Sequence, residues 1–118
     1  MADDAPGQEE EVALTEEELD KEHIWVRLTK PIKAYGEEVT IIKMRLPTGA
    51  DIFRIGNPVE FDPISDPPKI THNFQRMQQM IARLANIPSG SLEKMAPQDL
   101  VACAWAITHH FLPGSAQA

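Results

Sequence analysis

The chain has 118 residues, of which 18 are Asp or Glu and 11 are Lys or Arg, and its formal net charge is −7. This length allows one domain with a small hydrophobic core. The single cysteine excludes an internal disulfide, and no apolar run reaches the ~18 residues of a membrane span, so we expect a soluble, cytosolic protein that binds no membrane.

Most of the negative charge lies at the N-terminus. Residues 1–22 hold ten acidic residues and one lysine, a charge of −9, whereas residues 23–118 hold eight acidic and ten basic residues, a charge of +2. Acidic sequence with Pro, Gly and little to bury predicts disorder. We therefore expect a disordered acidic arm (1–22), one α+β domain (23–112) and a disordered tail (113–118). The arm either solubilises the protein, folds on a partner, or masks a surface of its own domain.

The domain begins with two segments that predict a β-hairpin. Residues 24–29 and 41–46 alternate between apolar and mixed side chains, the period of two of half-buried strands. Pro31 lacks a backbone donor and Gly36 permits a positive φ, so residues 31–38 are expected to form the connecting turn.

A short helix is predicted directly after the second strand. Thr48 is suited to cap a helix N-terminus, Asp51 stands three residues later as in a capping box, and Gly56 is suited to end the helix. Residues 47–56 are thus expected to form a strand-to-helix corner with a structural role.

Four prolines in residues 57–69 predict an extended, irregular connection. Val59, Phe61 and Ile64 are expected to hold it against the domain. A loop of this length is also a candidate contact surface.

The C-terminal half predicts helices. Thr71 is expected to cap a helix to residue 85, with one apolar stripe formed by Phe74, Met77, Ile81 and Leu84. A single turn at residues 91–95 precedes a last helix that Pro97 opens and that runs to about residue 111. This helix is apolar all round, so it must be buried on more than one side, by the domain itself or by a partner. The fold class is therefore α+β, an N-terminal β-hairpin followed by a small bundle of about three to four α-helices.

No pattern of catalytic or metal-binding residues is present in the sequence. The histidines lack zinc-ligand spacing, the glycines form no phosphate-binding loop, and the acidic residues fall at caps and in loops. Cys103 lies in an apolar run and is expected to be a small buried hydrophobe. The connection 86–96 is too long for a helix-turn-helix, and there is no basic stripe. We expect no enzyme activity, no cofactor, no metal and no nucleic-acid partner.

Several segments in succession resemble the tail assembly chaperone family of contractile-tailed, Mu-like and related phages. They are Leu-x-x-Pro-Ile from Leu28, Gly36, the run Ile-x-x-Met-Arg-Leu-Pro-Thr-Gly-Ala-Asp ending at Asp51, residues 81–88, and Pro-Gln-Asp-Leu from Pro97. The resemblance covers roughly residues 24–112. The acidic segment before Ile24 is longer than is typical of the family.

The resemblance implies a chaperone of the host bacterial cytoplasm that holds the tape-measure protein soluble, helps to recruit tail-tube subunits and is absent from the mature virion. Homo-oligomers are possible. A small DNA-binding phage regulator or a minor structural tail protein are the alternatives. The residues that would share core packing and partner binding are Phe74, Met77, Ile81, Leu84, Leu100, Val101, Trp105 and Phe111. For any single one, a place in the core is the simpler explanation.

Overall fold

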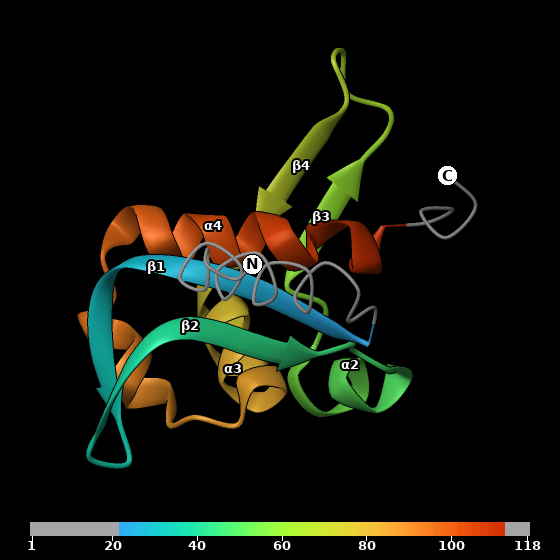
Figure 1. Ribbon diagram of the computed structural model, residues 1–118. Helices are drawn as coiled ribbons and strands as arrows, with labels where there is room; N and C mark the ends of the chain where they lie inside the picture. The colour runs from blue at the N-terminus through green and yellow to red at the C-terminus, as the bar shows by residue number, and fades with distance from the viewer. Residues whose placement is uncertain (1–21, 113–118) are drawn as a thin grey trace, which may run out of the picture.

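The computed structural model in Figure 1 describes residues 22–112, so the expectations for residues 1–21 and 113–118 lie outside the described part. Four strands and three α-helices follow one another within it, which confirms the α+β class. In chain order the elements are β1 (His23–Ala34), β2 (Glu37–Arg45), α2 (Gly49–Ile55), β3 (Val59–Asp62), β4 (Lys69–His72), α3 (Phe74–Ala85), the 3₁₀ helix η1 (Ser89–Lys94), α4 (Pro97–Thr108) and the 3₁₀ helix η2 (His109–Phe111).

Strands β1 and β2 form the predicted antiparallel hairpin, but the expected long turn at residues 31–38 is wrong. β1 continues through Pro31 to Ala34, and only Tyr35 and Gly36 turn the chain, with φ of 56° and 80°. Two successive positive φ values are typical of the two-residue turn that matches the twist of a hairpin.

Pro31 is tolerated because it lies in a bulge. Arg27 pairs with Ile41 and Ile32 pairs with Val39, so residues 28–31 stand opposite one residue of β2. The carboxylate of Asp99, in the first turn of α4, accepts hydrogen bonds from the backbone N–H of Thr29 at 3.0 Å and of Lys30 at 3.2 Å. Asp99 therefore replaces the strand partner that the bulge has lost, and it fixes α4 to β1.

Helix α2 forms the predicted corner. Asp51 accepts a hydrogen bond from the backbone N–H of Thr48 at 2.8 Å, and the N–H of Gly56 donates to the carbonyl of Ile52. The capping residues read from the sequence are confirmed.

Residues 57–72 hold a second hairpin where an irregular connection was expected, and this expectation is wrong. β3 and β4 pair antiparallel, with Phe61 opposite Ile70 and Val59 opposite His72. Asp62 closes the tip by accepting from the backbone N–H of Ile64 and from Ser65 Oγ. Val59 alone of the three expected anchors is buried, since Phe61 is 43% and Ile64 91% exposed. The hairpin projects from the body of the domain beside α4 (Figure 1).

Helix α3 begins later than predicted, because Asn73 rather than Thr71 caps it. The Asn73 side chain accepts from the backbone N–H of Arg76 at 3.1 Å, while Thr71 belongs to β4. α4 begins at Pro97 as predicted and continues into η2.

The core lies between the first hairpin and the helices, with α4 against β1 and α3 against β2. One face of the hairpin supplies Val26, Leu28, Ile32, Ile42 and Met44. The helical half of the domain contributes Met77, Met80, Ile81, Leu84, Leu92, Met95, Cys103, Ala104, Ile107 and Phe111. Burial raises the pKa of the Cys103 thiol to about 12, which agrees with the predicted inert hydrophobe.

Candidate functional site: an exposed apolar surface

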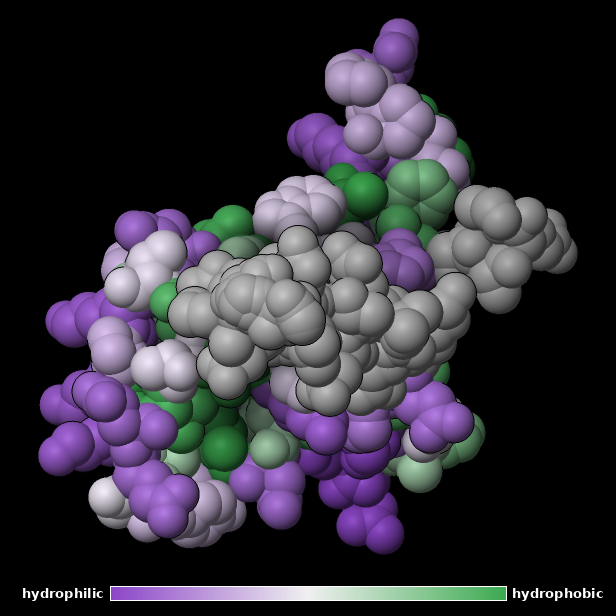
Figure 2. Space-filling view, viewed as in Figure 1, coloured by the Kyte–Doolittle hydropathy of each residue, from purple (hydrophilic) through white to green (hydrophobic). Residues whose placement is uncertain are grey.

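An apolar surface remains exposed where the second hairpin meets α4. On α4, Val101 and Trp105 are one turn apart and 42% and 53% exposed. Phe61 and Ile70 share one face of the second hairpin, because they form a cross-strand pair, and they are 43% and 38% exposed. Hydrophobic side chains gather at this junction in the space-filling view (Figure 2).

His72 joins the hairpin to the helices. Its ring lies edge-on to Trp105, with the ring centroids 4.8 Å apart, and edge-on to Phe74 at 5.7 Å. We call the set Phe61, Ile70, His72, Phe74, Val101 and Trp105 the Trp105 surface.

A hydrogen-bond chain holds His72 in position. The Thr108 hydroxyl donates to the carbonyl of Ala104 at 2.6 Å, and the same oxygen lies 2.9 Å from His72 Nε2. Since the only hydroxyl proton is used toward Ala104, His72 must donate from Nε2. Burial lowers the pKa of His72, which favours this neutral form.

A groove of about 410 Å³ adjoins the Trp105 surface at Phe74. Its apolar lining comes from α3, η1 and the start of α4, and the residues are Phe74, Leu92, Met95, Pro97 and Leu100. Gln75, Gln78 and Glu93 form its polar edge. We call it the Leu100 groove. Together with the Trp105 surface it forms a continuous apolar strip, because Phe74 belongs to both.

The structure divides the eight residues proposed as partner-binding into two groups. Met77, Ile81, Leu84 and Phe111 are buried in the core. The other four reach the surface: Phe74, Val101 and Trp105 are exposed, and Leu100 is half-buried. The apolar α4 thus packs one face on the domain and leaves the opposite face open.

Ile70 and His72 of the Trp105 surface were not found by sequence reasoning, whereas Phe61 lies in the segment 57–69 that was expected to be a loop and a candidate contact surface. Phe61 and Ile70 belong to the second hairpin, which was not predicted because four prolines in residues 57–69 indicated an irregular connection. His72 was expected in the first turn of a helix. The alternation of Val59, Phe61 and of Ile70, His72 is the signal that could have identified them.

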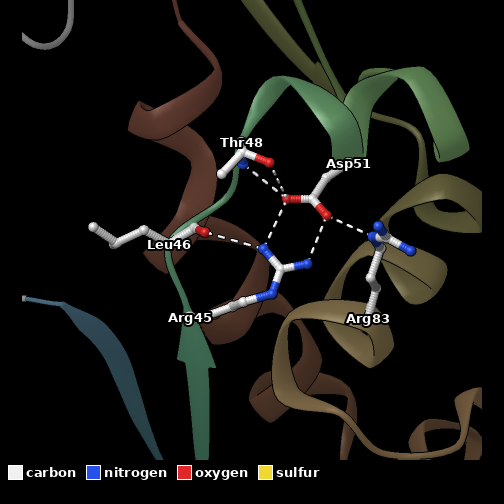
Figure 3. Close-up of polar contacts among 5 residues, drawn as sticks. All are labelled: Arg45, Leu46, Thr48, Asp51 and Arg83. Atoms are coloured by element: carbon white, nitrogen blue, oxygen red, sulfur yellow. Dashed lines mark hydrogen bonds and ion pairs between the residues drawn. The ribbon is translucent and has the colours of Figure 1, made fainter.

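The buried polar cluster around Asp51 is structural. Asp51 is fully buried, and it pairs with Arg45 Nη2 at 2.7 Å and with Arg83 Nε (Figure 3). These hydrogen bonds, the one from Arg45 foremost, hold the pKa of Asp51 well below its usual range. Arg45 comes from β2 and Arg83 from α3, so Asp51 links α2 to the first hairpin and to α3. Sequence reasoning found the cap but not the two arginines.

Other kinds of site find no support in the described residues. Between residues 22 and 112, no three His, Cys, Asp or Glu side chains are grouped as metal ligands would be. In the same range, no helix has both the length and the apolar character needed to cross a membrane. An α+β domain with an exposed apolar strip is of the class that contacts other proteins.

Comparison with known families assigns the chain within that class. Residues 26–112 match the family described as phage tail assembly chaperone proteins, E, or 41 or 14. The chain belongs to this family, as the sequence resemblance predicts. Its members act while phage tails are assembled in the host, and they are generally not enzymes. No similar chain was found among curated proteins or among solved structures.

Proposed function

We propose that this chaperone binds an amphipathic helix of the tape-measure protein on the Trp105 surface. In doing so it keeps the tape measure soluble in the host bacterial cytoplasm and helps to bring tail-tube subunits to it. It then leaves, so that the mature virion lacks it. The observation that carries the proposal is the exposure of Trp105 together with Phe61, Ile70, Phe74 and Val101, which form one apolar surface.

The chemistry of the surface suits an apolar helix face. Trp is among the side chains that most often dominate binding energy, and Phe is enriched in interface cores; here Trp105 and Phe74 flank His72. An amphipathic helix presents side chains at spacings of three, four and seven, and the strip from Phe61 to the Leu100 groove offers several successive contacts for them. Contacts of this kind are reversible, as a chaperone that later departs requires.

Co-expression with the tape-measure protein of the same phage tests the proposal. The wild-type chain should keep the tape measure in the soluble fraction, whereas the Trp105→Glu variant should leave most of it in the pellet. Phe53→Glu is the matched control, because Phe53 is 92% exposed on α2, away from the second hairpin (Figure 1). If the Trp105→Glu chain unfolds at the same temperature as the wild type and still keeps the tape measure soluble, the Trp105 surface is excluded as the binding site.

Two further measurements separate this proposal from the alternatives. Mass spectrometry of purified phage particles should not find the chain, whereas a minor structural tail protein would be present. Binding to duplex DNA should be undetectable at 0.15 M salt, whereas a DNA-binding regulator would show salt-dependent affinity. If the chain forms homo-oligomers through the same surface, Trp105→Glu should lower the mass measured by light scattering.

A further inference from the structure

The outward face of the first hairpin is basic. The side chains of Val26 and Ile42 point into the core, so the cross-strand pairs that alternate with them point outward. These pairs are His23 with Arg45, Trp25 with Lys43, and Arg27 with Ile41. Each of these three pairs contains one Lys or Arg and no carboxylate, whereas Lys33 pairs with Glu38 beyond the bulge, so the basic part of this face is the end near His23 and Arg45.

A pocket of about 410 Å³ lies at one end of this face. Its lining residues are His23, Lys43, Arg45, Arg83, Leu84 and Asn86. Asp51 neutralises one of the two guanidinium groups that meet on it (Figure 3). Counting Lys43, the pocket and its floor hold three cations and one carboxylate, a net charge of +2. Such a site suits a carboxylate-rich ligand.

The Trp25 ring adds an apolar side chain to this basic face. Lys43 Nζ lies 5.0 Å from the centroid of the Trp25 ring. The indole Nε1 of Trp25 is buried and has no hydrogen-bond acceptor among residues 22–112. The Trp25 ring thus adds apolar area beside a cation of this face.

We infer that the acidic segment 1–21 of the same chain docks on this basic face, with carboxylates toward the cations of the face and its apolar residues toward Trp25 and Ile41. The segment holds nine acidic residues and one lysine, a charge of −8, interrupted by Val12, Leu14 and Leu19. It joins the domain directly at the start of β1, next to His23. Twenty-one residues reach at most ~70 Å at ~3.3 Å per residue, several times the length of the face.

Tethering makes even a weak contact effective. A short linker gives a local concentration in the millimolar range, so the segment outcompetes dilute polyanions for the face. The docked segment would neutralise this basic face and keep it from nucleic acid. The contact is electrostatic and partly exposed, so salt should weaken it.

Two-dimensional NMR of the indole N–H groups tests the inference on full-length chains. The two tryptophans give two signals, which Trp105→Phe assigns. We expect a full-length variant with the nine acidic residues of 1–21 changed to Asn or Gln to shift the Trp25 signal and leave the Trp105 signal in place. Raising NaCl from 0.05 to 0.5 M should move the wild-type Trp25 signal toward its position in that variant.

A Trp25 signal that is identical in both proteins and insensitive to salt would overturn the inference. A shift that depends on protein concentration would also overturn it, because the arm would then bind a second copy. If the variant does not fold, its dispersed Trp105 signal is lost, and the wild-type salt titration decides. Lys43→Gln should weaken the salt response, whereas Lys69→Gln, on the second hairpin, should not.

Discussion

The two hairpins of this domain use the same element in opposite ways. β1–β2 is long, and its inward side chains are buried against α3 and α4. β3–β4 has four residues in each strand, projects from the body, and leaves Phe61 and Ile70 partly exposed. Residues buried in the first hairpin are therefore expected to determine stability, and residues exposed on the second are expected to determine partner binding.

The largest difference is expected for one apolar truncation in each hairpin. Ile42→Ala should cost ~2–5 kcal/mol of unfolding free energy, because Ile42 is 1% exposed and a cavity would remain. Ile70→Ala should cost less than ~1 kcal/mol, since Ile70 already contacts solvent. Urea unfolding followed by circular dichroism measures both. Equal losses would mean that the second hairpin is part of the core.

Asp51→Asn should give the next largest loss, about 3 kcal/mol, because two arginines would lose a buried anionic partner. The lowered pKa of Asp51 also predicts acid sensitivity. Its contribution is complete above the unfolded pKa of ~4 and is lost as the pH falls below that value. Urea unfolding at pH 7 and pH 3 measures this, and the gap between wild type and variant should shrink at pH 3. Glu60→Gln, on the exposed face of the second hairpin, is the control that should change neither value.

Thr108→Val should cost about 1–2 kcal/mol, because the variant loses the hydrogen bonds to His72 and to the carbonyl of Ala104. The change lies under the Trp105 surface, so it should also shift the Trp105 indole NMR signal. Thr108→Ser keeps the hydroxyl and should restore most of both effects. An unchanged Trp105 signal in Thr108→Val would show that His72 does not position this surface.

The smallest effect concerns the protonation of His72. Its pKa is lowered by burial, so the unfolded chain takes up a proton near pH 6.5 before the folded chain does. Stability is therefore unaffected above that pH and falls as the pH drops below it. NMR titration of the imidazole should give a midpoint below 6.5. Burial also lowers the pKa of His110, so both measurements are made in a His110→Asn background, where only His72 contributes this effect.

Local sequence signals predicted the parts of the fold that depend on neighbouring residues. The alternation in 24–29 and 41–46, the cap at Thr48 and Asp51, and Pro97 at the start of α4 are all confirmed. Each rests on an interaction within a few residues, which spacing alone reveals.

The parts that were predicted wrongly depend on distant residues. Pro31 stays in β1 because Asp99, about 70 positions away, accepts hydrogen bonds from the backbone N–H groups of Thr29 and Lys30 in the bulge. Prolines at 63, 67 and 68 suggested an irregular loop, but they lie between or beside the strands of the second hairpin, where no ladder donor is needed. The apolar sequence of α4 left open whether the domain or a partner covers it, and its contact with His72 depends on the pairing of β3 with β4.

Hydrogen–deuterium exchange on the complex with a tape-measure segment tests the division between the two hairpins most directly. The account predicts that binding slows exchange in residues 59–62, 69–74 and 100–105 and leaves the backbone of β2 unchanged. Protection confined to β1 and β2, with the second hairpin and α4 exchanging as in the free protein, would contradict it.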